Sequence, residues 1–351
     1  MAIEQTTDSN YPLLVSVIVP NWNGRHFLQP CLDSLLAQTM TRHEMIVVDN
    51  GSTDGSVELL RTHYAGKIVL IENDRNLGFA KGVNMGIAVA QGDLIALLNN
   101  DAIATPRWLE ELMRGLAYAD RVGMCAPKVL FAHDRTVIDN VGHLLYPDGM
   151  NVCRGRGEVD AGQYNAIEET LFPDGSAALY RKAMLDEIGG FDEQFFAFGE
   201  DAELGLRGRL SGWTCCYIPT AVVYHIRGGT MNRWSPTKAF LFERNRFWIV
   251  VKLFPLPWLI ISPLFTIIRW FWQAYSVFAA KGAAGRFARQ HSKGKLFFIL
   301  VKAYASGLYG LPRMLRKRWD VRRRKQLTDR EFLALLWRFR ANARDVALRD
   351  R

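Results

Sequence analysis

The fold is decided by residues 94–101, Leu-Ile-Ala-Leu-Leu-Asn-Asn-Asp, in which an apolar run ends in two carboxamides and a carboxylate. Such a run predicts a buried β-strand that carries polar oxygens to its carboxyl end. An earlier run, residues 45–48, ends in the same way in the acidic loop of residues 49–56. In open α/β folds, ligands bind at the carboxyl edge of the sheet. The two loops therefore predict a site for a nucleotide and a divalent metal at one edge.

Residues 15–100 alternate short apolar runs with segments of helical periodicity. We predict strands over residues 15–20, 45–48, 67–71 and 94–98, and helices over residues 27–38, 56–64 and 79–90. Alternation of strands and helices implies parallel strands joined by right-handed crossovers. Because these strands are continuously apolar, we expect the sheet to be buried on both faces. The sequence thus predicts an α/β fold with a mostly parallel sheet flanked by helices.

The rest of the chain is less regular, and we divide it by its composition. We predict a helix over residues 106–119, loops and edge strands over 137–172, a helix after the acidic turn in 190–211, strands over 214–218 and 221–225, and a helix over 236–252. We therefore divide the chain into a tail of residues 1–12, an α/β domain of residues 13–250 and a helical region of residues 251–351.

The charge of the chain is distributed unevenly. The 351 residues carry a net charge of +9, but residues 281–351 hold 20 Lys or Arg against 5 Asp or Glu, so the first 280 residues have a net charge of −6. Hydrophobic residues make up 49%, which excludes global disorder. The five cysteines show no metal-like spacing and indicate reduced, structural thiols. A polar N-terminus without an apolar signal core favours the cytoplasm.

The region after residue 250 combines apolar, aromatic and basic segments. Residues 253–268 carry no charge, but 16 residues fall short of the ~20 that span a bilayer, and three prolines argue against one straight helix. A second apolar stretch, residues 296–311, precedes basic clusters at 313–318 and 322–325. This order predicts an interfacial anchor on an anionic membrane rather than a nucleic-acid site. A buried helical pair that forms a dimer interface is the alternative.

Two loops offer groups that suit a nucleotide. Residues 49–56 supply carboxylates, hydroxyls and the amide of Asn50, which can both donate to and accept from a pyrimidine edge. Residues 75–86 place three glycines, four residues apart, on one face of a predicted helix whose N-terminus suits a phosphate. The structural alternatives are a turn with a helix N-cap for the first loop and tight helix–sheet packing for the second.

Three further positions carry candidate chemistry. Asp101 suits Mg²⁺ or Mn²⁺, which prefer oxygen ligands. Glu200 and Asp201 follow four aromatic residues that would desolvate a carboxylate and raise its basicity, as a general base requires. His225 follows a predicted strand and precedes Arg227 and two glycines, which is typical of an active-site loop. Each has a structural alternative: a simple turn at the end of a strand for Asp101, stabilisation of a helix N-terminus for Glu200 and Asp201, and a purely structural role for His225.

In this order, these motifs resemble the family 2 glycosyltransferases of GT-A fold, and most closely their bacterial rhamnosyltransferase branch. The resemblance covers about residues 13–250. It rests on the segments VIVPNWN at 17–23, VDNGSTDGS at 48–56, NLGFA at 76–80, NND at 99–101, GED at 199–201, and His225 with its Gly-Gly-Thr.

The resemblance implies a role for each motif. The residues implied in nucleotide-sugar binding are Pro20, Asn21, Asn23, Asp49, Asn50, Asp54, Arg75, Asn76, Gly78, Lys81, Asn99 and Asn100. Asp101 would bind Mg²⁺ or Mn²⁺ at the diphosphate, and His225 would complete the metal site. Asp201 would be the catalytic base, supported by Glu200. Residues 244–245, Arg-Asn, resemble a pair common in this branch.

The resemblance also implies a reaction. Many members have Asp where Asn50 stands and a second carboxylate where Asn99 stands, and Asn50 fits a thymine nucleotide. We predict an inverting transfer of L-rhamnose from dTDP-β-L-rhamnose to a saccharide acceptor, carried on a lipid, in bacterial cell-surface polysaccharide synthesis. We expect the protein at the cytoplasmic face of the inner membrane.

Three alternatives stay open at this point. The first is a family 2 glycosyltransferase that uses a UDP-hexose. The second is a nucleotide-dependent oxidoreductase, which would need a G-x-G-x-x-G turn after the first strand, where this chain has Pro-Asn-Trp-Asn-Gly. The third is a non-catalytic membrane scaffold, against which the intact Asp101, Asp201 and His225 speak.

Overall fold

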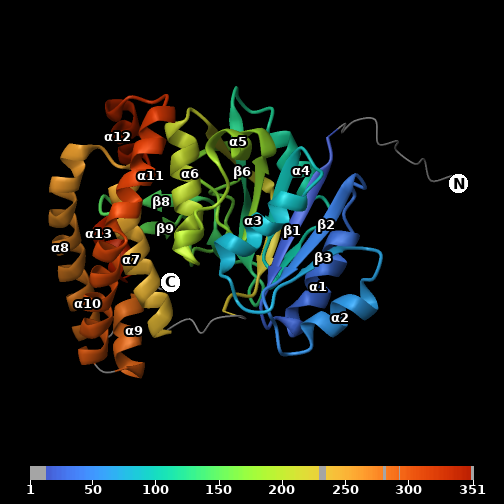
Figure 1. Cartoon of the computed structure of the whole chain (residues 1–351), viewed down its shortest axis with the longest axis horizontal. Helices are drawn as coiled ribbons and strands as arrows, with labels where there is room; N and C mark the ends of the chain where they lie inside the picture. Colours follow the sequence, from blue (N-terminus) through green and yellow to red (C-terminus); the bar gives the residue numbers. More distant parts are fainter. Residues whose placement is uncertain (1–12, 229–234, 280–281, 292, 349–351) are drawn as a thin grey trace, which may run out of the picture.

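The computed structural model describes residues 13–228, 235–279, 282–291 and 293–348, so the tail of residues 1–12 and the Gly229–Thr230 part of the His225 motif lie outside it (Figure 1). The strands are β1 (Val15–Asn21), β2 (His43–Asp49), β3 (Val69–Glu72), β4 (Leu94–Leu98), β5 (Ala102–Ala104), β6 (Val122–Phe131), β7 (Ile138–Asn140), β8 (His143–Leu145), β9 (Asn151–Cys153), β10 (Glu168–Thr170), β11 (Ala177–Arg181) and β12 (Thr214–His225).

The helices follow in the same chain order. They are α1 (Arg25–Leu36), α2 (Ser56–His63), α3 (Phe79–Val89), α4 (Trp108–Gly115), α5 (Lys182–Ile188), α6 (Glu200–Leu210), α7 (Pro236–Leu253), α8 (Leu256–Phe278), α9 (Gly282–Gln290), α10 (Lys293–Tyr309), α11 (Leu311–Arg324), α12 (Asp329–Arg338) and α13 (Ala343–Leu348).

A ten-stranded mixed sheet forms the centre of the α/β domain. Its strand order is β10-β12-β6-β11-β4-β1-β2-β3, with β5 added beside β12 and β7 beside β6. β1 runs parallel to β4 and β2, and β2 runs parallel to β3. β11 is antiparallel to both of its neighbours, β4 and β6, whereas β6 and β12 are parallel. The prediction of a mostly parallel sheet flanked by helices is confirmed.

Helices cover both faces of this sheet, as its continuously apolar strands predict. On one face, α1, α2 and α4 pack against the odd-numbered apolar residues of β1, Val15, Val17 and Val19. On the other face, α3 packs against β1, and Ile18 of that strand shares a core cluster with side chains of α3, α5 and α6. This alternation follows from the two-residue period of a strand. The polar carboxyl ends of the strands therefore remain as the place where a ligand can approach.

The glycines of α3 are explained by close packing. A side chain on Gly86 would come within 2.7 Å of Ile18 Cγ2 in β1, and one on Gly82 within 2.8 Å of Asn50 Nδ2. Gly78 has φ +90° and lies against Phe196, whose backbone oxygen would be 2.7 Å from an added Cβ. α3 thus approaches the sheet and the loop before α6 closely because these three residues lack side chains.

Several predicted elements differ from the structure. One strand, β12, replaces the two predicted over residues 214–218 and 221–225, because the strand continues through an irregularity between Ile218 and Val222. α4 is shorter than the predicted helix over residues 106–119. One helix, α8, covers most of the uncharged run: Pro257 lies in its first turn, where no N–H is needed, and Pro263 lies inside it.

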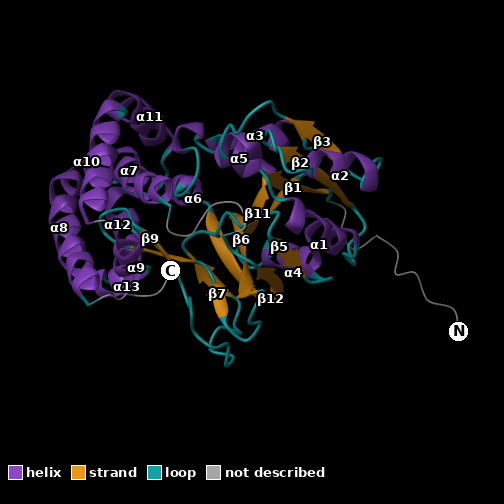
Figure 2. Cartoon of the chain, turned by 90° about the horizontal axis from the view of Figure 1, so that it is seen from below, coloured by secondary structure: helices purple, strands orange, loops and turns teal. Residues whose placement is uncertain are grey.

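The C-terminal region is helical and packs onto the α/β domain, at the side away from β1–β3 (Figure 2). α7 runs across residue 250, where we placed the domain boundary. Apolar side chains of α7, α11 and α12 share one core cluster with Leu171 and Phe172 of the α/β domain. Among the described residues, no helix has both the length and the apolar character that crossing a membrane would require.

Buried charges join the C-terminal helices to the rest of the chain. The guanidinium of Arg269 in α8 is fully buried and lies 2.7 Å from Asp148 Oδ2 and 2.7 Å from Glu243 Oε1. Arg246 Nε, one turn after Glu243 in α7, is 2.7 Å from Glu243 Oε2. Burial alone would raise the pKa of Glu243, but the two arginines outweigh it and lower the pKa to about 2. The network therefore consists of ionised groups that depend on one another.

We expect Arg269→Met to destabilise the protein by about 3–5 kcal/mol, because it leaves two buried carboxylates short of a cation. Urea unfolding followed by circular dichroism measures this loss. The control is Arg61→Met, which removes the exposed ion pair with Glu72 and should change the free energy of unfolding by about 1 kcal/mol or less. Equal losses in the two variants would contradict the role given to Arg269.

Candidate active site

Hydrogen bonds connect the carboxyl ends of β4, β1 and β2. Asn100 Nδ2 donates to Asn21 Oδ1 at 2.6 Å, and Asn21 Nδ2 donates to Asp49 Oδ2 at 2.7 Å. All three side chains are buried. The two polar loops that the sequence placed at one sheet edge therefore meet there, as predicted.

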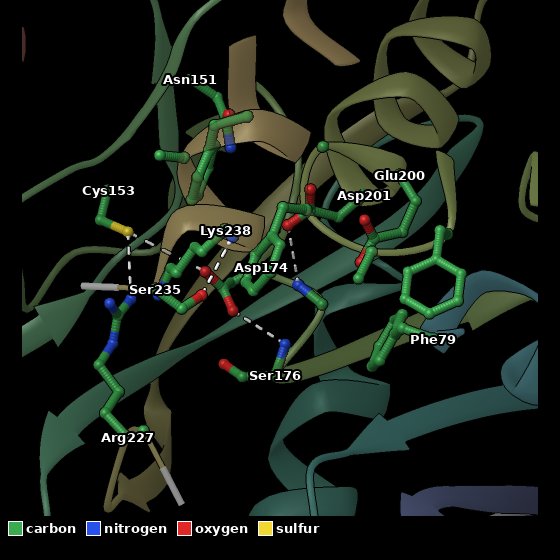
Figure 3. Close-up of a pocket in the computed structure, with 18 of the residues that line it drawn as sticks. Phe79, Asn151, Cys153, Asp174, Ser176, Glu200, Asp201, Arg227, Ser235 and Lys238 are labelled. Atoms are coloured by element: carbon green, nitrogen blue, oxygen red, sulfur yellow. Dashed lines mark hydrogen bonds between the residues drawn. The ribbon is translucent and has the colours of Figure 1, made fainter. Parts of the chain in front are cut away.

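A cavity of about 540 Å³ opens at this edge, within the range of small-molecule sites. Eleven of the sequence-predicted site residues line it: Pro20, Asn21, Asn50, Asn76, Gly78, Asn99, Asn100, Asp101, Glu200, Asp201 and His225. Residues from β1, α6, β12 and the connecting loops, among them the loop after β4, thus contribute to one space. Figure 3 shows the part of the cavity around Asp174 and Asp201.

Five predicted nucleotide-binding residues are outside the cavity lining. Asp49 accepts hydrogen bonds from Asn21 and from Ser52 N and Oγ, so its carboxylate holds the loop together. Asn23 Oδ1 accepts from Thr53 N, and Asp54 accepts from Arg25 N.

The other two lie on the surface. Lys81 Nζ is 3.9 Å from Glu193 Oε2 with its side chain 45% exposed, and Arg75 is exposed. The nucleotide-binding role of all five residues stays a prediction.

The Asp101–His225 pair has the geometry of a metal site. β5 runs antiparallel to β12 with Ala102 opposite His225, which brings Asp101 to the end of β12. His225 Nε2 and Asp101 Oδ1 are 3.2 Å apart, close enough to share one ion. His225 Nδ1 is 2.9 Å from Asp139 Oδ2. A carboxylate on Nδ1 fixes the ring and directs the Nε2 lone pair toward a metal.

The surroundings of this pair favour positive charge. Burial alone would lower the pKa of His225, but Asp101 and Asp139 raise it to about 9. The oxygen Oδ1 of Asn99, which also lines the cavity, is buried and finds no hydrogen-bond partner among the described residues. The donor set of carboxylate, imidazole and carboxamide fits Mg²⁺ or Mn²⁺. The residues present therefore fit the predicted metal.

Glu200 and Asp201 begin α6 and are buried. Asp201 Oδ2 accepts from Gly175 N at 3.1 Å, and its Oδ1 accepts from Ala202 N at 2.7 Å (Figure 3). Burial raises the pKa of both carboxyls, and Asp201 raises that of Glu200 further. Glu200 Oε2 is buried and has no partner among the described residues. Of the two, Asp201 is therefore the one that is fixed in place by donors and more readily ionised.

The loop before these carboxylates is held by the Arg-Asn pair of α7. Asn245 Nδ2 lies within 3.0 Å of the carbonyl oxygens of Phe195, Ala197 and Phe198. Arg244 donates to the same Phe195 oxygen at 3.0 Å. Phe198, like Phe196, has positive φ, a conformation that a bulky residue adopts only when its surroundings enforce it. The pair thus positions the aromatic loop that leads into Asp201.

Sequence reasoning missed several residues of the site. Asp139 holds both His225 and Arg227, with Arg227 Nε 2.8 Å from its carboxylate. Asp174 accepts from Ser176 N in the turn that also orients Asp201. The Asp-Gly-Ser of residues 174–176 just before a strand repeats the pattern that drew attention to residues 49–56. That signal was available in the sequence.

His143, Cys153 and Asp174 form a second cluster of possible metal ligands, with donor atoms within 4.8 Å of one another. His143 Nε2 lies 3.1 Å from Asp174 Oδ2. Burial alone would lower the pKa of His143, but its neighbours raise it to about 9. Arg156 and Arg227 lie 3.7 and 3.6 Å from Cys153 Sγ. Because these two cations repel a metal ion, the cluster fits an internal ion pair better than a metal centre.

Comparison with known proteins identifies relatives of this domain. Residues 16–189 match the model of the family "Glycosyl transferase family 2". The O-antigen biosynthesis protein RfbC of Myxococcus xanthus is 30% identical over 220 residues, which cover 60% of this chain and only 17% of that protein. The N-acetylglucosaminyl-diphospho-decaprenol L-rhamnosyltransferase of Mycobacterium tuberculosis is 25% identical over 266 residues, which cover 67% of this chain and 86% of that protein.

A solved structure shows the same fold. The mannosyltransferase PcManGT from Pyrobaculum calidifontis, in complex with GDP-Man and Mn²⁺, is similar with a TM-score of 0.52 at 17% sequence identity. The similarity covers 93% of this chain and 86% of that one.

We expect Asn245→Ala to loosen the loop before α6, because it leaves the carbonyl oxygens of Ala197 and Phe198 without their side-chain donor, a cost of about 1–3 kcal/mol. Hydrogen–deuterium exchange by mass spectrometry should show at least ~10-fold faster exchange in residues 195–203 and no change in β1 or β4. The control is Asn342→Ala, an exposed residue whose Nδ2 donates only to Asp345. Unchanged exchange in the loop would contradict the positioning role of Asn245.

Proposed function

Residues 16–189 of this chain belong to glycosyl transferase family 2 in a GT-A fold, and from this we propose that the protein is an inverting glycosyltransferase. It moves a sugar from a nucleoside diphosphate to a hydroxyl group of a saccharide acceptor. One observation carries the proposal: the buried carboxylate of Asp201 and the Asp101–His225 pair open into the same cavity. A base and a site for a cation at one sheet edge are what this transfer requires.

Asp201 is the base in this proposal. It takes the proton of the acceptor hydroxyl as that oxygen attacks the anomeric carbon and the nucleoside diphosphate leaves. Burial raises the pKa of Asp201, which increases its affinity for the proton, while the donors from Gly175 and Ala202 keep the carboxylate oriented. Burial and the neighbouring Asp201 raise the pKa of Glu200 further, so Asp201 is the more readily ionised of the two carboxyls. A single base on one side of the sugar gives inversion.

Asp101 and His225 would hold Mg²⁺ or Mn²⁺, and the oxygen of Asn99, unpartnered among the described residues, lines the same cavity. When bound, the cation offsets the negative charge that develops on the departing diphosphate. Asp139 acts from behind His225: it accepts from Nδ1 and keeps Nε2 directed toward Asp101. Arg227, in turn, neutralises Asp139.

The donor that we propose is dTDP-β-L-rhamnose, which would give an α-L-rhamnosidic link. A mycobacterial relative is named an L-rhamnosyltransferase, and Asn50 lines the cavity where a pyrimidine would lie. Asn50 Nδ2 donates to Gly78 O at 3.2 Å and Asn50 Oδ1 accepts from Asn73. The amide retains a second N–H and a second lone pair for a base. A UDP-hexose is the alternative donor.

The acceptor that we propose is a saccharide carried on a lipid, at the cytoplasmic face of a bacterial inner membrane. Supporting this, large apolar side chains are exposed along α8 and α10, among them Ile260 at 82% and Tyr309 at 84%. The basic clusters at residues 313–318 and 322–325 contribute less to membrane attraction than their number of charges suggests, because several of these side chains have partners within the protein. Lys317 pairs with Asp192, Arg318 donates to Val251 O, and Lys325 pairs with Asp329.

We expect Asp201→Asn to lower the transfer rate by at least ~10³-fold, because an amide cannot accept the proton. Transfer of radiolabel from dTDP-rhamnose to the lipid extract of the source cells measures the rate. Donor affinity, measured by calorimetry, should stay within about twofold. The control is Asp186→Asn on the exposed side of α5, which should leave both values unchanged. Wild-type transfer by Asp201→Asn would refute the assignment of the base.

A further inference from the structure

The cavity extends past the carboxylates to a wall that is almost entirely apolar. We call this part the apolar arm; its side chains come from α8, α9 and α10, and they are Trp270, Val277, Ala284, Phe287, Leu296, Ile299 and Leu300. We propose that the apolar arm holds the hydrocarbon chain of the acceptor while the acceptor's sugar reaches Asp201. This inference rests on the proposed function and specifies how the substrate of the same site is bound.

The polar and the apolar groups of the cavity lining come from different parts of the chain. Polar groups, among them Asp201 and Arg227, belong to the α/β domain. Ser235 and Lys238, at the start of α7, add further polar groups to the lining, together with Phe242 one turn later. The apolar arm lies on the helices that follow in the chain. A ligand with a sugar, a charged linker such as a phosphate and a hydrocarbon chain offers groups that suit both parts of this lining.

Trp270 adds a second observation. Its ring lies edge-on to Tyr304, with ring centroids 5.7 Å apart. Its Nε1 is buried and finds no acceptor among the described residues. A buried N–H without an acceptor is destabilising, and an oxygen atom of the linker would satisfy it. Trp270 lines the cavity beside Gln273, the one polar side chain that α8 contributes to it.

The outer surface of the same helices explains how the hydrocarbon chain of the acceptor would reach the apolar arm. α8, α9, α10 and α13 lie side by side at one end of the molecule (Figures 1 and 2). Phe278, at the end of α8, is 80% exposed, and Phe297 in α10 is 70% exposed. Each CH₂ group that leaves water on binding stabilises the bound hydrocarbon. A hydrocarbon chain that passes from a bilayer into the apolar arm along these helices avoids exposure to water.

The proposal is tested with dodecyl phosphate that carries a diazirine at the end of its chain, used with the full-length protein below the micelle concentration. After irradiation, mass spectrometry locates the attached label. We expect labelling at residues 270–300 that line the apolar arm. We expect Ala284→Phe, which fills the arm, to reduce it at least 10-fold. The matched control is Ala117→Phe at an exposed position, which should keep labelling within twofold of wild type.

Two further results decide the proposal. Labelling confined to exposed side chains, or equal labelling in wild type and Ala284→Phe, would overturn it. If Ala284→Phe loses its cooperative thermal transition, Leu300→Phe takes its place with the same expectation. Donor binding is measured separately on each protein: wild type that fails to bind any nucleotide sugar contradicts the proposed function, whereas wild type that binds donor without labelling the arm contradicts only this inference.

Discussion

Burying a carboxylate without a cation or hydrogen-bond donors costs several kcal/mol, and this constraint organises the structure. Asp148 and Glu243 are paired with arginines, and Asp192 is paired with Lys252. These pairs join the C-terminal helices to the α/β domain. Because the Asp148–Arg269 and Asp192–Lys252 pairs cross between elements far apart in the chain, these elements cannot separate without exposing or isolating a charge.

In the cavity, the need of a buried carboxylate for a cation or for hydrogen-bond donors is only partly met. Glu200 has a buried oxygen without a partner among the described residues, and its pKa is raised accordingly. Asp101 faces a histidine whose other nitrogen is already engaged by Asp139. Groups in this condition gain from a proton, a cation or a substrate hydroxyl. Their concentration in one cavity, rather than any single motif, is the physical argument for catalysis there.

The sequence predicted the parallel half of the sheet and the meeting of the loops at residues 49–56 and 99–101, because apolar strands that end in polar residues are a local pattern. That Asp201 and His225 join the same site was implied by the family resemblance. It did not predict Asp139 or His143. Both lie in residues 137–172, which lack a period, and Asp139 meets His225 only through the pairing of β7, β6 and β12. The basic clusters were interpreted from charge alone, which cannot show that Lys317 faces Asp192. Contacts between distant residues depend on register and packing, which composition does not encode.

The C-terminal helices contribute to the same cavity as the carboxyl edge of the sheet. α7 supplies Asn245 to the loop before Asp201, and α8 to α10 close the far side of the cavity. A helical region that served only as an anchor would not need to contribute to the site. We therefore regard the α/β domain and the helices as one catalytic unit.

The most direct test of this account is release of nucleoside diphosphate by the purified full-length protein, measured with dTDP-rhamnose, UDP-glucose, UDP-galactose and GDP-mannose in the presence of Mn²⁺ or Mg²⁺. The account predicts release from dTDP-rhamnose at least ~10-fold faster than from the other donors, loss of release with EDTA, and recovery on adding the metal. Preference for a UDP-sugar would contradict the donor assignment. No binding and no release with any donor would contradict the central claim that this cavity transfers sugars from nucleotides.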